Sequence, residues 1–200
     1  MICLSLVVLV LVEVGSGKLD ASTDFSELSG LSSRKLSSTA LQYGRVLAKG
    51  IDSSDTVTPT RVNFAHTFTD PIVIPMVATH YYPNYVTYSL TSIDSSGFEV
   101  ILESNSEGPF LKDHGYEQVS YFAIDVGQTL PVDMQAGKIT LTGSSWNNVV
   151  FSHPFSEEPV VLASVQTRND GKIVVVFIQN LDANGFEIAI RNLGSAGPGT

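Results

Sequence analysis

Histidine and cysteine side chains are too few and too scattered in this sequence to form a recognisable catalytic or metal site. The only cysteine is Cys3, so neither an intrachain disulfide nor a thiolate-rich zinc site is possible. No pair of histidines has the i, i+4 spacing of a helical metal site; the four are His66, His80, His114 and His153. The motifs of serine hydrolases, zinc proteases, phosphate-binding loops and dinucleotide-binding folds are also missing. We therefore predict no catalytic residues, no metal and no cofactor.

The most unusual group of side chains is a cluster of tyrosines. It consists of Tyr81, Tyr82, Asn84 and Tyr85. Exposed tyrosines on a loop stack on sugar faces or anchor a protein partner, because each offers a large contact area at a low cost in conformational entropy. The alternative is that the rings cover the end of a folded domain. These four residues are the candidate ligand-binding site.

Other polar and aromatic residues fit structural roles better. His66 and His153 each lie between phenylalanines, where a half-buried histidine bonded to the backbone is commoner than a ligand or a base. His114 and Glu117 could form a hydrogen-bonded pair where a strand begins. Trp146 fits a core or interface position better than a sugar platform.

The elements that must position these residues come from an internal repeat. Residues 62–103 resemble residues 149–191, with an offset of 87 or 88 positions. The repeated residues are mostly aromatic residues and turn glycines: Phe64, His66, Phe68, Gly97, Phe98 and Glu99 return as Phe151, His153, Phe155, Gly185, Phe186 and Glu187. A repeat of this length is the size of a domain and longer than a solenoid unit.

Each copy has the pattern of short strands separated by turns. Residues 62–68 alternate apolar and polar side chains, which predicts a strand. Residues 72–79 are almost continuously apolar, which suits a central strand, although Pro75 indicates an edge or a bulge. No segment has helical periodicity over a useful length. The pattern predicts an all-β protein with two tandem antiparallel β-sandwich units, the second incomplete.

The predicted units are residues 41–130 and residues 131–200. The second unit stops before any counterpart of residues 117–127, and residues 1–40 are an apolar segment followed by a linker. Residues 2–14 have two interpretations: a secretory signal, or a strand, because residues 12–15 resemble residues 124–127. A strand at the N-terminus could fill the last unit of the next subunit, head to tail. The chain could equally be a piece of a longer repeat array.

Composition limits the partners. The net charge of −9 opposes binding to nucleic acid, which needs clustered lysine and arginine. No apolar run is long enough to span a membrane. With 43% hydrophobic and 16% charged residues, the composition is typical of a globular protein.

The order of motifs resembles the H-type lectin domain. The resemblance rests on core and turn residues: Phe64, Phe68, Pro71, Val73, Gly97, Phe98, Val100, Tyr121, Ala123 and Ile124. The segment containing His114, Glu117, Val119 and Tyr121 is also similar to tandem repeats of large bacterial surface proteins. The resemblance implies six-stranded antiparallel sandwiches that often form trimers and bind N-acetylgalactosamine-type sugars. The Asp and Arg that contact sugar in that family have no match in residues 80–85, whereas Arg168 and Asp170 occur in the second copy.

These observations favour a non-enzymatic extracellular module for carbohydrate binding or surface adhesion, whose partner is a glycan or another cell-surface molecule. The alternative is a self-assembling structural subunit of an extracellular filament or surface array, which polymerises by strand complementation. Both interpretations predict a homo-oligomer or a polymer.

Overall fold

The computed structural model describes residues 4–12, 41–50, 58–81, 86–104, 115–127, 134–168 and 174–192; for residues 4–12, 104 and 192 it describes the backbone alone. All regular structure in these ranges is β-strand. The strands are β1 (Leu4–Val12), β2 (Leu41–Lys49), β3 (Thr60–Asn63), β4 (Pro71–Val77), β5 (Val86–Asp94), β6 (Gly97–Ser104), β7 (Tyr116–Asp125), β8 (Met134–Thr142), β9 (Asn147–Val150), β10 (Val160–Val165), β11 (Val174–Gln179) and β12 (Gly185–Asn192). The predicted all-β class is therefore confirmed.

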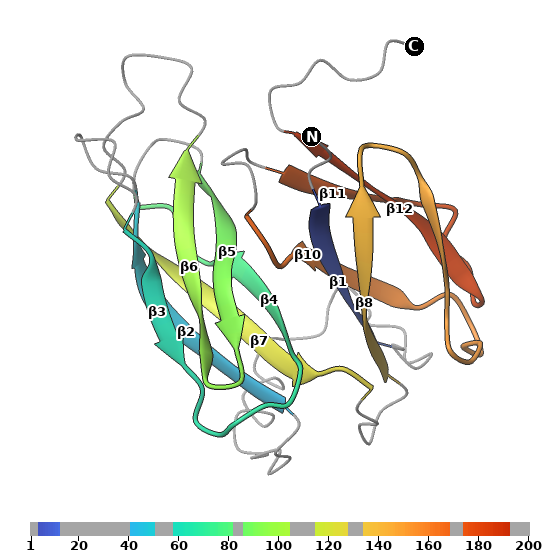
Figure 1. The fold of residues 1–200 in the computed structure, drawn as a ribbon, viewed down its shortest axis with the longest axis horizontal. Helices are drawn as coiled ribbons and strands as arrows, with labels where there is room; N and C mark the ends of the chain where they lie inside the picture. The colour runs from blue at the N-terminus through green and yellow to red at the C-terminus, as the bar shows by residue number, and fades with distance from the viewer. Residues whose placement is uncertain are drawn as a thin grey trace, which may run out of the picture.

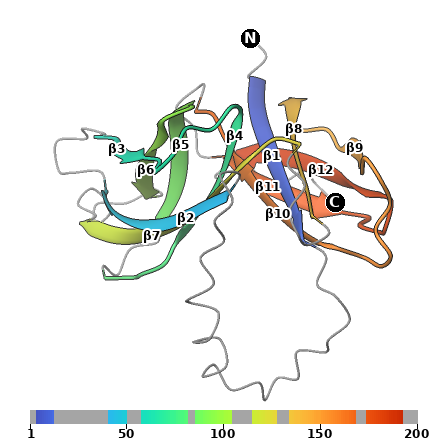
Figure 2. The ribbon, with the colours of Figure 1, turned by 90° about the horizontal axis from the view of Figure 1, so that it is seen from below.

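The strands form four antiparallel sheets of three strands, which are arranged as two pairs (Figure 1). In the first pair, the sheet β2-β7-β4 and the sheet β3-β6-β5 share one hydrophobic core. In the second pair, β10-β1-β8 and β11-β12-β9 share another. Figure 2 shows the two pairs side by side, with β4 facing the second pair. The two pairs follow the two copies of the repeat, except for β1.

The repeated phenylalanines occupy equivalent places in the two cores. The ring centroid of Phe64 lies 4.7 Å from that of Phe68 and 5.8 Å from that of Phe98. Around Phe151, the corresponding distances in the second core are 5.0 Å and 5.6 Å. The first contact of each set is edge-to-face, the arrangement that the quadrupole of an aromatic ring favours. The repeat in the sequence is thus a repeat in packing.

The strand that was predicted over residues 62–68 is too long. β3 ends at Asn63, and the next residues leave the sheet. The backbone N–H of Phe64 donates to Ser96 O at 2.7 Å, and that of Phe68 donates to Ser95 O at 2.9 Å. The loop therefore bonds to the turn between β5 and β6 instead of a neighbouring strand. The rings of Phe64 and Phe68 therefore enter the core from this bent loop and not from a straight strand.

A glutamine on the strand that precedes each copy, β2 or β8, holds this loop from the other side. Gln42 Oε1 accepts from the Ala65 N–H at 2.7 Å, while its Nε2 donates to the Tyr121 hydroxyl at 2.7 Å. In the second copy, Gln135 Oε1 accepts from the Ser152 N–H at 2.8 Å. Neither glutamine was singled out from the sequence.

β4 is an edge strand of its sheet, so the prediction of a central strand was wrong and the inference from Pro75 was right. Its apolar run has a different cause, because β4 is covered on both faces. Val73 faces the first core. Ile72 faces the other way and packs against Met134 and Ala136 of the second pair. Edge strands with an apolar outer face need such a cover, since exposed edges recruit other chains.

β1 completes the second pair of sheets from the far end of the chain. It lies between β10 and β8 and pairs antiparallel with both. Its register against β8 runs from Leu4 opposite Thr142 to Val12 opposite Met134. β7 takes the same central place between β2 and β4, so β1 is the spatial counterpart of β7. The complementing strand thus comes from the same chain here. Residues 13–15, the rest of the matching motif, lie outside the described residues.

Candidate functional site at the junction of the sheet pairs

Of the predicted binding cluster, the structure describes Tyr81 alone; Tyr82, Asn84 and Tyr85 lie outside the described residues. The Tyr81 side chain is 65% exposed. Its backbone N–H donates to Glu117 Oε1 at 2.7 Å, and the Thr79 hydroxyl donates to Glu117 Oε2 at 2.5 Å. Glu117 is fully buried, so it anchors the start of this loop. His114, its predicted partner, lies outside the described residues.

The more elaborate polar arrangement lies where β4 meets the second pair of sheets. The side-chain amide of Gln166 behaves like a strand neighbour toward Val73, because Oε1 accepts from the Val73 N–H at 2.9 Å and Nε2 donates to Val73 O at 2.6 Å. The Ser164 hydroxyl also donates to Val73 O, at 2.7 Å. Gln166 and Ser164 are 4% and 2% exposed. These bonds satisfy edge groups of β4 that would otherwise be buried without partners.

Two ion pairs flank this contact. Arg168 Nε lies 2.8 Å from Glu103 Oε1, and the Glu103 side chain is only 4% exposed. Lys138 on β8 pairs with Asp70, at the start of β4. The Asp70 side chain is 58% exposed, so solvent screens this second pair and it contributes little to stability. We call the contacts of Ser164, Gln166, Arg168, Lys138, Met134 and Ala136 with the first pair of sheets the junction.

A polar pocket of about 490 Å³ opens at the junction. It is lined by Thr69, Asp70, Pro71, Thr91, Ser92, Ile93, Asp94, Ser95, Lys138, Gln166, Thr167 and Arg168. Hydroxyl, amide and charged groups dominate, and the lining holds no histidine or cysteine. The lining holds two cations, Lys138 and Arg168, and two carboxylates, Asp70 and Asp94, so it carries no excess of either charge. Side chains of these types can hold a polar ligand through hydrogen bonds.

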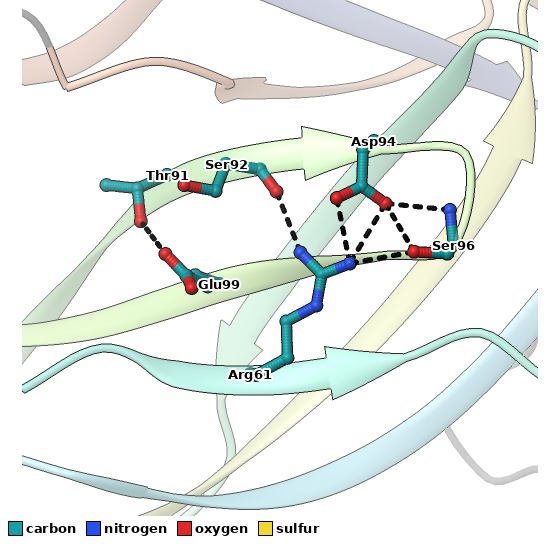
Figure 3. A network of polar contacts seen from close by, with 6 residues as sticks. All are labelled: Arg61, Thr91, Ser92, Asp94, Ser96 and Glu99. Atoms are coloured by element: carbon teal, nitrogen blue, oxygen red, sulfur yellow. Dashed lines mark hydrogen bonds and ion pairs between the residues drawn. The ribbon is translucent and has the colours of Figure 1, made fainter.

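One wall of the pocket is stiffened by an arginine on β3 (Figure 3). Arg61 Nη2 donates to Asp94 Oδ1 at 2.9 Å and to Oδ2 at 2.8 Å, and Nη1 donates to Ser92 O at 3.1 Å. Ser96 donates to Asp94 Oδ1 from its backbone N–H at 2.8 Å and from its hydroxyl at 2.7 Å. Figure 3 shows that these contacts join β3 to the turn between β5 and β6. The turn between β5 and β6, which recurs in the second copy, is thus held by the guanidinium of Arg61.

This network predicts a stability that depends on pH in the acid range. Hydrogen bonds from Ser96, with the ion pair to Arg61, lower the pKa of the Asp94 carboxyl group from 3.8 to about 2. Because the folded-state pKa is depressed, the stabilisation is complete above pH 4 and is lost as the pH falls toward 2. In urea denaturation at a series of pH values, Asp94→Asn is expected to be less stable than wild type above pH 4. The difference should shrink between pH 4 and pH 2, and a constant difference would contradict the assignment.

Ser92 offers a second test, because its backbone is in the left-handed region with φ 49°. The equivalent residue in the second copy is Asn180, with φ 51°. Asparagine tolerates this conformation better than serine does, so Ser92→Asn is expected to raise the free energy of unfolding by about 0.5 kcal/mol. The reverse change, Asn180→Ser, should lower it by a similar amount. Thermal denaturation of both variants checks the signs; a loss of stability in Ser92→Asn would contradict the argument.

The remaining sequence candidates have structural surroundings. His66 packs against Phe68 with ring centroids 4.5 Å apart, and among the described residues its buried Nε2 has no hydrogen-bond partner. Trp146 is 38% exposed and lies under the guanidinium of Arg191 at 5.6 Å. Within the described ranges, no three histidine, cysteine or acidic side chains gather as metal ligands would. The same ranges contain no helix with the length and hydropathy of a membrane span.

The junction residues escaped the sequence analysis, although one signal was present. Along β10 and just beyond it, alternate positions change from Val160 and Leu162 to Ser164 and Gln166. A strand face that turns from apolar to polar indicates a polar contact at that point. The pattern does not reveal the partner, which is the backbone of Val73, 93 residues away.

Comparison with known proteins adds no assignment: no family model matches the chain, and neither curated proteins nor solved structures yielded a match. The resemblance to H-type lectins and to bacterial surface repeats therefore stays a prediction.

Proposed function

We propose that this protein is a non-enzymatic structural subunit of an extracellular filament or surface array, built from two tandem β-sandwich units that exchange β1 between copies. The observation that carries the proposal is the place of β1. The strand belongs to the N-terminus, yet it is the central strand of a sheet formed otherwise by the C-terminal half. In the first unit, the same place is taken by β7, which comes from that unit's own segment.

The energetic argument concerns β8 and β10. Without β1, these strands have no common neighbour, and their backbone groups on both sides of the slot lose their partners. A free strand edge of this kind recruits an extended segment from another chain. β1 is suited to fill it because its sequence, LSLVVLVLV, consists almost wholly of leucine and valine. The second unit therefore depends on a segment that any copy of the chain can supply.

Donation within one chain and donation between chains make the same contacts in the slot. They differ in the closure of the connection from β1 to β2, which spans residues 13–40. The free-energy cost of closing a connection of this length is small. The balance between donation within one chain and donation between chains therefore depends on protein concentration. Reciprocal exchange gives a closed dimer, whereas head-to-tail donation extends into a filament.

Cross-linking between two differently labelled copies tests the proposal. In a Cys3→Ser background, one copy carries Leu6→Cys on β1 and the other carries Thr140→Cys on β8, at positions directly opposite each other. Facing positions on antiparallel strands are close enough for a disulfide. After joint refolding and oxidation, we expect disulfide-linked heterodimers whose yield rises with protein concentration.

A matched pair in the first unit provides the control. Arg45→Cys on β2 and Ser120→Cys on β7 also lie opposite each other, but both strands belong to one continuous unit. These two copies should yield no heterodimer. Absence of heterodimers from the Leu6 and Thr140 pair, at concentrations up to about 1 mM, would refute exchange.

A second candidate function is adhesion through a glycan or another cell-surface partner. The observation that favours it is Tyr81, which presents an exposed ring on a backbone that buried Glu117 holds in place. Rigid exposed tyrosines are typical contact residues at low entropic cost. Binding on a glycan array that is lost in Tyr81→Ala and Tyr85→Ala would support this function. The absence of any glycan signal from the wild-type protein would count against it.

A further inference from the structure

We infer that the junction is a latch that controls the exchange of β1, an inference that rests on the strand exchange proposed above. β1 leaves its slot only when β8 and β10 release it. The junction ties both of these strands to one element, β4 of the first pair of sheets. Its contacts therefore keep the two walls of the slot at a fixed separation.

The wall formed by β10 is held by shielded hydrogen bonds. Just beyond the end of β10, Gln166 bonds to both backbone groups of Val73, and Ser164 on β10 adds a third bond. All three bonds lie away from solvent, since Gln166 and Ser164 are almost completely buried. Water cannot replace them gradually, so separation leaves the Val73 groups without partners until the junction opens widely. This makes Gln166 the main barrier of the latch.

The wall formed by β8 is held by weaker contacts. Met134 and Ala136 pack against Ile72 and Ile124, which are both fully buried. The ion pair between Lys138 and Asp70 is solvent-exposed on the Asp70 side. Packing of this size and an exposed ion pair restrain β8 less than the buried bonds restrain β10. We therefore expect the two walls to respond unequally to substitution.

The latch also links the seating of β1 to the covering of the β4 edge. β4 is the edge of its own sheet, and the junction is what satisfies its exposed side. When β1 is seated, β10 is placed to cover this edge. When β1 leaves, the position of β10 relative to β8 is no longer fixed, and β4 regains an open edge. Release of β1 thus exposes edges of β8, β10 and β4 in one step, which favours capture by a second copy.

The experiment measures the exchange rate of the Leu6→Cys and Thr140→Cys copies, mixed in native buffer without refolding. Gln166→Leu, introduced into both copies, removes both bonds to Val73 and puts an apolar side chain of similar size in place of the amide. We expect heterodimers to form at least ten times faster than without the substitution. Lys138→Met should accelerate formation by no more than about threefold, because the ion pair is screened.

Gln42→Leu is the matched control. Gln42 also donates one hydrogen bond and accepts another through its side-chain amide, but its partners, Ala65 and Tyr121, lie within the first pair of sheets. Its substitution destabilises the protein without touching the junction, so the exchange rate should change less than twofold. Chemical denaturation of both variants measures how far their stabilities differ.

The outcomes are distinct. Fast exchange in Gln166→Leu with normal exchange in Gln42→Leu supports the latch. Equal acceleration by both variants overturns it, because general destabilisation would then explain the rate. Exchange in every variant at the wild-type rate also overturns the latch and leaves the proposed assembly standing. No heterodimer in any variant, even after joint refolding, overturns the assembly and the latch together.

Discussion

Replacing Gly97 by alanine is expected to lower the free energy of unfolding by about 3 kcal/mol or more. Gly97 begins β6 and lies opposite Asn63 at the end of β3. A Cβ atom added there would lie 2.1 Å from the carbonyl oxygen of Val62. The obstacle is backbone, so no side-chain rotation can relieve it, and either the β3–β6 pairing or the turn must shift. Gly185 in the second copy meets Val149 O at 2.2 Å, so Gly185→Ala should have a similar effect.

Gly137 is the control for this prediction. It lies within β8, where an added Cβ would have no heavy atom of the described residues within 4 Å. Gly137→Ala should therefore change stability by no more than about 0.5 kcal/mol, with a tendency to stabilise because alanine restricts the unfolded chain. Urea denaturation followed by circular dichroism measures all three variants. Equal stability of Gly97→Ala and Gly137→Ala would show that the close approach to Val62 is wrong.

Proline at the centre of β1 is expected to be at least as damaging. Leu9 lies between Gly137 of β8 and Ala163 of β10, so a strand covers it on each side. Leu9→Pro removes the N–H and adds a ring where a central strand has no room, at a cost of about 3 kcal/mol or more. The effect should fall on the second pair of sheets, because the first pair does not contain β1. Hydrogen exchange should show loss of protection in β8 and β10, with protection retained in β2 and β7.

The repeat supplies an unusual control. Pro75 already occupies β4, opposite Tyr121 of β7, and the equivalent residue in the second copy is Ala163 on edge strand β10. Since β4 accepts proline at this position, we expect the N–H of Ala163 to point away from β1. Ala163→Pro should therefore cost much less than Leu9→Pro. If both variants lost protection equally, β1 would not be the central strand.

Much of the local structure was predictable because it depends on short-range patterns. The spacing of Phe64, Phe68 and Phe98, repeated around Phe151, predicted two equivalent cores, and the aromatic distances agree with this. Period-two alternation predicted the strands, since successive side chains of a strand point to opposite faces. The alternation failed at residues 64–68, where bonds to the β5–β6 turn compete with a strand. A partner 30 residues away is not part of a local pattern.

The candidate site was less predictable for the same reason. Exposure of Tyr81 agrees with a loop residue, but its buried anchor, Glu117, was assigned a different partner. The junction was missed because Gln166 recognises the backbone of Val73, and backbone groups leave no mark in a sequence. The Asp94 network was missed because Arg61 has no counterpart in the second copy, so the repeat did not indicate it.

The amino-acid sequence by itself determined that the chain forms strands and that two segments share one core design. It left residues 2–14 open between a secretory signal and a strand that resembles the end of β7. The tertiary structure alone decided that β1 lies between β8 and β10 and that β4 rests on Gln166. The physical reason is range: periodicity and turn chemistry act between near neighbours, whereas the satisfaction of buried backbone groups depends on which distant segments meet.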